Sequence, residues 1–123
     1  MSKGVAVKAV APVAVVPVYN PSMGVEQWRP LIAKYFPANQ VDNALRIMAA
    51  ESGGVPTRDN RGLNRDGSVG YGLMQINSIH ADMVNGDLES LRNPDVNVRV
   101  AASIYGGRGW CAWSTAPSLN LCD

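Results

Sequence analysis

Few side chains in this sequence can carry acid–base, nucleophilic or metal chemistry. The chain holds one histidine, His80, two cysteines and three glutamates. Glu51 is the most informative, because helical spacing precedes it and two glycines follow it, which places it in the last turn of a helix. The negative end of the helix dipole and apolar neighbours such as Met48 raise the pKa of a carboxyl group there. Glu51 is therefore a candidate proton donor to a leaving-group oxygen, although a glutamate at a helix end is more often a solvated surface residue.

Nucleophilic and metal chemistry have weaker support in the sequence. His80 could serve as a base for Ser78 or Cys111, as in a peptidase, but the sequence places no third group to orient it. A lone histidine is more often a surface or packing residue. The cysteines and His80 also lack the paired short spacings of a zinc site. We expect no metal and no cofactor.

The two cysteines, Cys111 and Cys122, could form a disulfide. They are separated by ten residues that include Pro117. In the chain-entropy model, closing this loop near the C-terminus would add about 3 kcal/mol of stability. A disulfide would favour an oxidising compartment, and free thiols are the alternative.

Two predicted helices position Glu51. Residues 27–36 have apolar side chains at helical spacing, with Pro30 in the first turn and a proline directly after the segment. The second helix takes Asp42 or Asn43 as its N-cap and ends at the two glycines that follow Glu51. Its predicted buried face consists of Ala44, Leu45, Met48 and Ala49.

The second half of the chain is predicted to add a small polar lobe and one more helix. Residues 55–71 are rich in turn-forming residues, which favours turns and a small hairpin. Residues 72–77 predict a strand-to-helix turn whose core residues are Leu73, Met74 and Ile76. Asn93-Pro94 opens a helix and Gly106-Gly107 ends it, with one face formed by Val98, Ala101, Ala102 and Tyr105. This pattern describes an α+β domain that is mainly α.

Length and composition limit the class of protein. The chain has 123 residues and a formal charge of +1, with 46% hydrophobic and 17% charged residues. One folded domain is expected, and wholesale disorder is not. The near-neutral charge and the scattered arginines argue against a protein that binds nucleic acid.

The N-terminal segment differs in composition from the rest. Residues 3–18 are almost entirely Val, Ala, Pro and Lys, and Pro12 and Pro17 would break a helix or a central strand. We expect residues 1–22 to form an extended tail and residues 23–123 to form the folded domain. A secretory leader is the alternative, although prolines interrupt its apolar run and no A-x-A cleavage site follows. The apolar stretch is shorter than the ~20 residues of a membrane span, so no integral membrane protein is expected.

Several motifs follow one another in a fixed order around and after Glu51. They are AESGG at 50–54, DGS at 66–68, YGLMQINS at 71–78, Asn93-Pro94 with Asn97, and GWCAW at 109–113. In order and spacing they resemble the lysozyme superfamily. ESGG and GLMQIN are similar to the lytic transglycosylase and lysozyme-like domains of bacteria and their phages. DGS-x-x-YG-x-x-QINS and W-x-AW are similar to chicken-type lysozymes, and the likeness covers about residues 28–113.

The resemblance implies a two-lobed lysozyme-like fold, with a cleft between a helical lobe and a small β-hairpin lobe. It implies that Glu51 is the general acid and that Gln75 and Asn77 are polar groups of the cleft floor, where amides can match the N-acetyl groups of a sugar. It also implies that Trp110 covers the acid, since in lysozyme a glutamic acid packed against a tryptophan stays protonated while a second carboxylate stays ionised. Trp110 and Trp113 could instead both belong to the core. Further candidate substrate contacts are Ser68, Tyr71 and Tyr105.

One position departs from the chicken-type pattern. The residue before the Tyr-Gly pair is the second carboxylate in that pattern, and here it is Gly70. Asp66 and Asp59 are candidates for a second carboxylate, but Asp-Gly-Ser is also an ordinary turn. The missing carboxylate favours a mechanism with a single glutamic acid, as the resemblance to lytic transglycosylases implies. Goose-type hydrolysis through a positioned water stays open.

The sequence therefore predicts a glycosidase that cuts the β-1,4 bond between N-acetylmuramic acid and N-acetylglucosamine in peptidoglycan. It would act outside the cytoplasm as a muramidase or lytic transglycosylase of a bacterium or a phage. The expected partner is the glycan strand, and other virion or envelope proteins are candidate partners of the N-terminal tail. The alternative is a structural virion or cell-envelope component whose degenerate fold binds glycan without cutting it, which Gly70 and the tail motivate.

Overall fold

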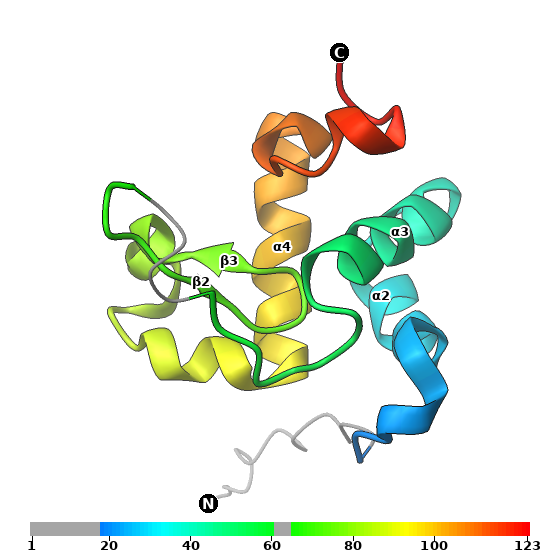
Figure 1. Cartoon of the computed structure of the whole chain (residues 1–123), viewed down its shortest axis with the longest axis horizontal. Coiled ribbons are helices and arrows are strands. Elements are labelled where there is room, and N and C mark those ends of the chain that lie inside the picture. Colours follow the sequence, from blue (N-terminus) through cyan, green and yellow to red (C-terminus); the bar gives the residue numbers. More distant parts are fainter. Residues whose placement is uncertain (1–17, 61–64) are drawn as a thin grey trace, which may run out of the picture.

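Helices make up most of the chain that the structure, a computed structural model, describes (Figure 1). The described residues are 18–60 and 65–123. Within them a two-stranded antiparallel sheet accompanies three α-helices and several 3-10 helices. The α+β class with a predominance of helix, expected from the sequence, is confirmed.

The first helical layer consists of η1 (Pro21–Trp28), α2 (Arg29–Tyr35), η2 (Ala38–Gln40) and α3 (Val41–Glu51). Helix α2 confirms the first predicted helix: Pro30 lies in its first turn, and Leu31 and Ile32 are buried. Helix α3 packs against α2 and η1. Glu51 is its last residue, as the sequence predicted.

Two details of α3 differ from the prediction. The helix starts at Val41 with Gln40 as its N-cap, so the predicted cap at Asp42 or Asn43 is wrong. The reason is that the 3-10 turn of η2 runs directly into the helix and supplies its first hydrogen bonds. Ala49, predicted to lie on the buried face, is exposed. The buried face of the helix includes Ile47 instead.

The small hairpin was predicted within residues 55–71, but the two strands of the sheet lie later, between residues 70 and 77. Strand β2 (Gly70–Tyr71) pairs with β3 (Ile76–Asn77), and residues 72–75 form the turn between them. Residues 58–60 run beside β2, since Asp59 and Tyr71 form an antiparallel bridge. The predicted strand-to-helix turn over 72–77 is therefore a hairpin, but its apolar side chains are in the core, as predicted: Leu73, Met74 and Ile76. Two 3-10 helices, η3 (Ser78–Val84) and η4 (Leu88–Arg92), complete this lobe.

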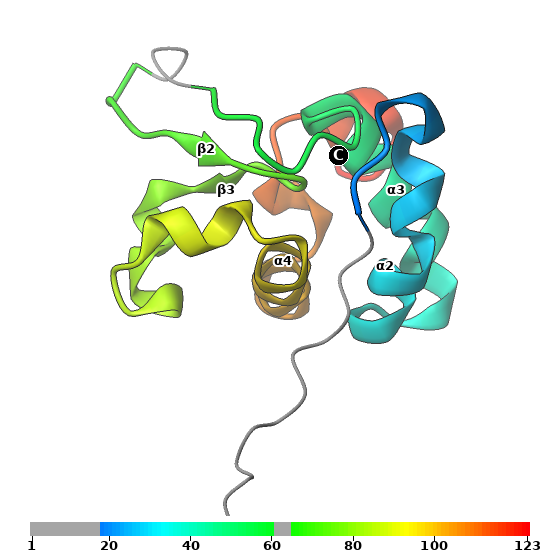
Figure 2. The same cartoon turned by 90° about the horizontal axis from the view of Figure 1, so that it is seen from below.

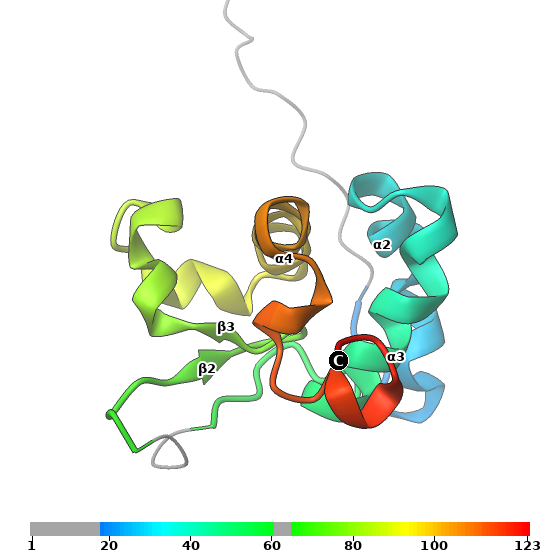
Figure 3. The ribbon, with the colours of Figure 1, turned by 90° about the horizontal axis from the view of Figure 1, so that it is seen from above.

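Helix α4 (Pro94–Arg108) runs between the helical layer and the hairpin lobe, as the views from below and from above show (Figures 2 and 3). Asn93 caps it as predicted, because its side chain accepts hydrogen bonds from the backbone N–H groups of Asp95 and Val96. The predicted end at Gly106-Gly107 is wrong. Both glycines lie inside the helix, which ends before Gly109, where the backbone takes a φ of +68°.

Buried polar side chains connect these parts at the hairpin turn. Asn97 of α4 is fully buried; its Oδ1 accepts from the Met74 N–H at 2.9 Å, and its Nδ2 donates to the carbonyls of Tyr71 and Leu91 at 2.8 Å each. Such hydrogen bonds satisfy backbone groups that would otherwise be buried without partners. Asn97 therefore fixes the hairpin against α4.

Residues 1–17, which hold most of the predicted tail, lie outside the described residues. Ordered elements start at Pro21, and the ring of Tyr19 stacks on that of Trp28 at a centroid distance of 6.4 Å. The division of the chain into an extended tail over residues 1–22 and a folded domain over residues 23–123 stays a prediction. No helix in the described part of the chain is long and apolar enough to cross a membrane.

Gly72 provides a test of the hairpin turn. Its φ is +71°, and a Cβ atom there would lie 2.5 Å from the Leu91 carbonyl oxygen and 2.6 Å from Asn97 Nδ2. We expect Gly72→Ala to lower the free energy of unfolding by roughly 2–5 kcal/mol, measured by urea denaturation, through backbone strain and overpacking.

Gly106→Ala is the matched control. A Cβ atom at this position inside α4 meets nothing within 4 Å. The control should gain about 0.5–1 kcal/mol from the better helix propensity of alanine. Equal effects of the two substitutions would contradict the close approach at Gly72.

Candidate active site

Glu51 is held at the junction of α3 and the hairpin. The next residue, Ser52, is fully buried; its Oγ donates to the carbonyl of Leu73 at 2.7 Å and accepts from the Gly54 N–H at 3.1 Å. Gly53 and Gly54 have φ values of +68° and +88°, so the chain turns sharply away from the helix. These contacts fix the end of α3 and leave the Glu51 side chain half-buried at its edge.

Glu51 lines a surface pocket of about 230 Å³. The other lining residues come from the segment before β2, from the hairpin and from the segment after α4: Asn60, Gly70, Gln75, Asn77, Ala112, Trp113 and Ser114. Three of them carry side-chain amides, and none of them is charged. Glu51 is thus the one carboxylic acid among the described residues that line this pocket.

Burial raises the pKa of Glu51 above its usual range. The hydroxyl of Thr115 acts in the opposite direction, because its Oγ1 donates to Glu51 Oε2 at 2.6 Å and stabilises the ionised form. The net direction is upward. A half-buried acid with a raised pKa can hold a proton and deliver it into the pocket.

The side-chain amides of the hairpin are themselves held in place. Gln75, with a φ of +50°, donates from Nε2 to the carbonyls of Arg58 at 2.8 Å and Gly72 at 2.9 Å, so its free acceptor is Oε1. Asn77 Nδ2 donates to Ser68 Oγ at 3.0 Å. Ser68 is buried and holds the amide of Asn77 rather than lining the pocket among the described residues.

Gly70 stands where the chicken-type pattern has its second carboxylate. A Cβ atom on Gly70 would lie 2.7 Å from Gln75 Oε1 and 3.0 Å from Asn60 Oδ1. The Asn60 oxygen also accepts the Gly70 N–H at 2.5 Å. Neutral amide oxygens therefore occupy the space that a side chain at position 70 would need.

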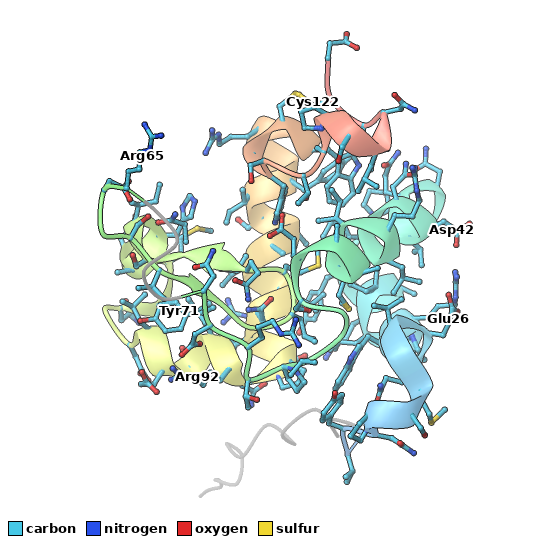
Figure 4. All side chains as sticks on the ribbon, in the orientation of Figure 1. Glu26, Asp42, Arg65, Tyr71, Arg92 and Cys122 are labelled. Atoms are coloured by element: carbon cyan, nitrogen blue, oxygen red, sulfur yellow. A yellow bond between two sulfur atoms is a disulfide. The ribbon has the colours of Figure 1, made fainter. Side chains whose placement is uncertain are left out.

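The two aspartates considered as replacements lie elsewhere. Asp66 is exposed, and its Oδ1 accepts from both the N–H and the Oγ of Ser68, which lowers the pKa of Asp66 and makes it part of a turn. Asp59 is ion-paired with Arg92, whose guanidinium also lies 5.3 Å from the ring centre of the buried Tyr71 (Figure 4). Among the described residues, neither aspartate nor Tyr71 lines the Glu51 pocket.

The two tryptophans differ in position from the expectation. Trp113, not Trp110, lines the Glu51 pocket among the described residues, and its Nε1 donates to the Met74 carbonyl at 2.8 Å. Trp110 packs in an aromatic cluster with Phe36 and Tyr105, with ring centroids 5.6 Å and 4.5 Å away. Its Nε1 donates to Gln40 Oε1 at 2.8 Å. Trp110 therefore lies in the core, the partly buried Tyr105 packs against it, and Trp110 contacts Trp113 of the pocket wall at 5.4 Å.

A smaller pocket of about 40 Å³ adjoins the first and shares four residues with it. His80 lines this second pocket, together with Ile76 and Ile104. The two pockets together form a groove along the hairpin. Within the described part of the chain, no group of three or more His, Cys, Asp or Glu residues is arranged to hold a metal ion.

The segment after α4 closes the groove opposite the hairpin. A disulfide joins Cys111 and Cys122, whose Cα atoms are 5.1 Å apart. The loop between them carries Trp113, Ser114 and Thr115, all of which contribute to the surroundings of Glu51. Sequence reasoning did not single out Asn60, Ser114 or Thr115, because their types and spacing carry no signal of what they contact.

A comparison with family models matches residues 32–115 to a family described as a lysozyme-like domain. No curated protein and no solved structure matches the chain. The matched span includes α3, the hairpin, α4 and Trp113, and therefore every described residue that lines the Glu51 pocket.

The burial of Glu51 makes the stability of the protein depend on pH. Because folding raises the pKa of Glu51, its carboxyl group contributes stability that is present below the ordinary pKa of glutamic acid and lost as the pH rises through the raised value. Glu51→Gln removes this titration. We expect the stability of the variant relative to the parent to increase between about pH 4 and about pH 8 in urea denaturation. A constant or shrinking difference would argue that burial does not raise the pKa.

Proposed function

The chain belongs to the lysozyme-like domain family, and we propose from this membership and the geometry of the Glu51 pocket that it cleaves the glycan strand of peptidoglycan. The family relates the chain to peptidoglycan-directed glycosidases and transglycosylases and to action outside the cytoplasm. The bond we propose is the β-1,4 bond between N-acetylmuramic acid and N-acetylglucosamine. The observation that carries the proposal is a half-buried glutamic acid with a raised pKa in a pocket whose other described lining residues are uncharged and include three side-chain amides.

Glu51 is the proposed general acid. Its proton passes to the glycosidic oxygen as the bond from that oxygen to C1 breaks, which leaves positive charge at C1 and an ionised Glu51. Burial favours the protonated form before this step, and the hydroxyl of Thr115 stabilises the carboxylate after it. The same side chain then acts as a base.

The second step needs an oxygen nucleophile, because a second carboxylate is lacking among the described residues of the pocket. In a transglycosylase this nucleophile is the 6-hydroxyl of the muramyl sugar. Its oxygen bonds to C1, its proton returns to Glu51, and the product has an anhydro end. In a hydrolase a water molecule takes this place and gives a reducing end. In the transglycosylase route Glu51 alone acts as acid and base and regains its proton. In the hydrolase route a base farther away can take the proton of the water, as in inverting enzymes, and Glu51 regains its proton from the solvent.

The pocket amides support recognition of an N-acetylated sugar. An acetamido group presents one N–H donor and one carbonyl acceptor, which side-chain amides can match. Asn60, Gln75 and Asn77 provide such groups along one wall, and the indole of Trp113 provides an apolar surface on the other. We propose these four residues as the substrate contacts.

The disulfide and the N-terminal segment bear on where the protein works. A disulfide persists in oxidising compartments, which supports secretion or association with the cell wall or a virion of a phage. The N-terminal tail is the proposed contact for other virion or envelope proteins.

The second candidate function is glycan binding without cleavage, in a structural component. It is favoured by the neutral amides at the place of the second carboxylate.

Replacing the acid tests the assignment of Glu51. Glu51→Gln keeps the size and the hydrogen-bonding capacity of the side chain but cannot donate a proton as an acid. We expect turnover of purified peptidoglycan to fall at least about 10²-fold, with folding intact by circular dichroism. Glu26→Gln is the matched control, because Glu26 is exposed at the edge of the molecule, is paired with Arg29 and does not line the Glu51 pocket (Figure 4). Wall clearing by the Glu51 variant at the rate of the control would reject the assignment.

Product analysis separates the remaining possibilities. Mass spectrometry of peptidoglycan digested by the parent protein should show new glycan ends. Anhydro-muramyl ends indicate transglycosylation, and reducing ends indicate hydrolysis. Binding to peptidoglycan with no new ends of either kind would favour the structural component and overturn the proposed enzyme.

A further inference from the structure

The hydroxyl group of Thr115 donates a hydrogen bond to the carboxyl group of Glu51. Thr115 is half-buried, and its Oγ1 lies 2.6 Å from Glu51 Oε2. Among the described residues, the structure gives the other oxygen, Oε1, no hydrogen-bond partner. The two oxygens of the proposed acid are therefore not equivalent.

A hydroxyl group has one proton and can donate one hydrogen bond. When the Thr115 hydroxyl donates to Oε2, that oxygen acts as the acceptor and the acidic proton resides on Oε1. If the proton were on Oε2 instead, it would point at Thr115 and away from the pocket. We infer that Thr115 is a positioning residue, which fixes the rotamer of Glu51 and keeps its proton on Oε1 for transfer to the substrate. This inference rests on the proposed role of Glu51 as the acid.

The surroundings of Thr115 hold it firmly enough for this role. Its carbonyl accepts from Ser118 Oγ at 2.9 Å, and the following residue, Ala116, is fully buried. The Ala116 N–H donates to the Trp113 carbonyl at 3.1 Å. Arg46 of α3 donates to the Leu119 carbonyl at 2.7 Å, which connects the loop to the helix that carries Glu51. The disulfide closes the same loop at its base.

Within residues 18–60 and 65–123, no charged group shifts the pKa of Glu51. Burial and the Thr115 hydroxyl are the two causes of the shift in the pKa of Glu51 among the described residues. Neither the hairpin nor the loop adds a charged side chain to the pocket lining. Two described groups with titratable or charged side chains lie on the surrounding elements: His80 lines the adjoining pocket, and the guanidinium of Arg46 donates to the Leu119 carbonyl.

Two substitutions separate the hydrogen bond from the packing. Thr115→Val keeps the shape of the side chain and removes the donor, whereas Thr115→Ser keeps the donor and removes a methyl group. The titration of the Glu51 carboxyl carbon is followed by NMR in the parent and in both variants. Turnover of a soluble peptidoglycan fragment is measured across the same pH range.

We expect the valine variant to titrate at higher pH than the parent, because the lost hydrogen bond stabilised the ionised carboxyl. Its kcat should fall about tenfold or more with little change in KM, because the acid is no longer oriented. The pH at which activity falls on the alkaline side should also be higher in this variant than in the parent. The serine variant should match the parent in all three respects.

An unchanged Glu51 titration and kcat in the valine variant would overturn the inference. So would a serine variant that behaves like the valine variant, because this result would assign the effect to packing. If the parent protein cuts no glycan, the proposed function fails on its own, while the titrations still decide whether Thr115 controls the Glu51 carboxyl.

Discussion

The backbone of the hairpin turn at residues 71–74 is the point on which the structure depends. Three buried side chains from distant parts of the chain bind it: Ser52 after α3, Asn97 in α4 and Trp113 in the disulfide-closed loop. Each makes a hydrogen bond that a buried backbone group would otherwise lack, so losing one costs about 1–3 kcal/mol. Because all three meet at one turn, they bring the end of α3, the hairpin and the loop together, and the walls of the pocket follow from this arrangement.

This arrangement places a carboxyl group where its charge is disfavoured. Burial raises the pKa of Glu51, its hydrogen-bond partner within the described residues is the neutral hydroxyl of Thr115, and the amides that share the pocket lining are neutral too. A nearby cation would have stabilised the ionised form, lowered the pKa of the carboxyl and left less of the protonated form at neutral pH. The molecule thus gives up stability at neutral pH at the position where the proposed mechanism needs a proton. The amides of Asn60 and Gln75 beside Gly70 are also neutral. They occupy the place where the chicken-type pattern has a second negative charge.

Local signals explain what could be predicted from the sequence. The end of α3 at Glu51 was predictable because two glycines with positive φ follow it, and the start of α4 because Asn93 and a proline form a common helix start. The choice between Trp110 and Trp113 was not, because it depends on the turn at Gly109 and on a carbonyl acceptor 39 residues away. Thr115 was missed for the same reason: its partner lies 64 residues earlier in the chain.

The central claim is that a glycan strand binds in the Glu51 pocket, and binding of a peptidoglycan fragment to the Glu51→Gln variant tests it most directly. This variant should bind the fragment without cutting it, so the complex can be followed by NMR. We predict that the side-chain amide signals of Gln75 and Asn77 and the indole N–H signal of Trp113 shift together on binding, while that of Trp28, which is fully buried and does not line the pocket, shifts less than these three. Shifts confined to other surfaces, with the pocket signals unchanged, would contradict the account.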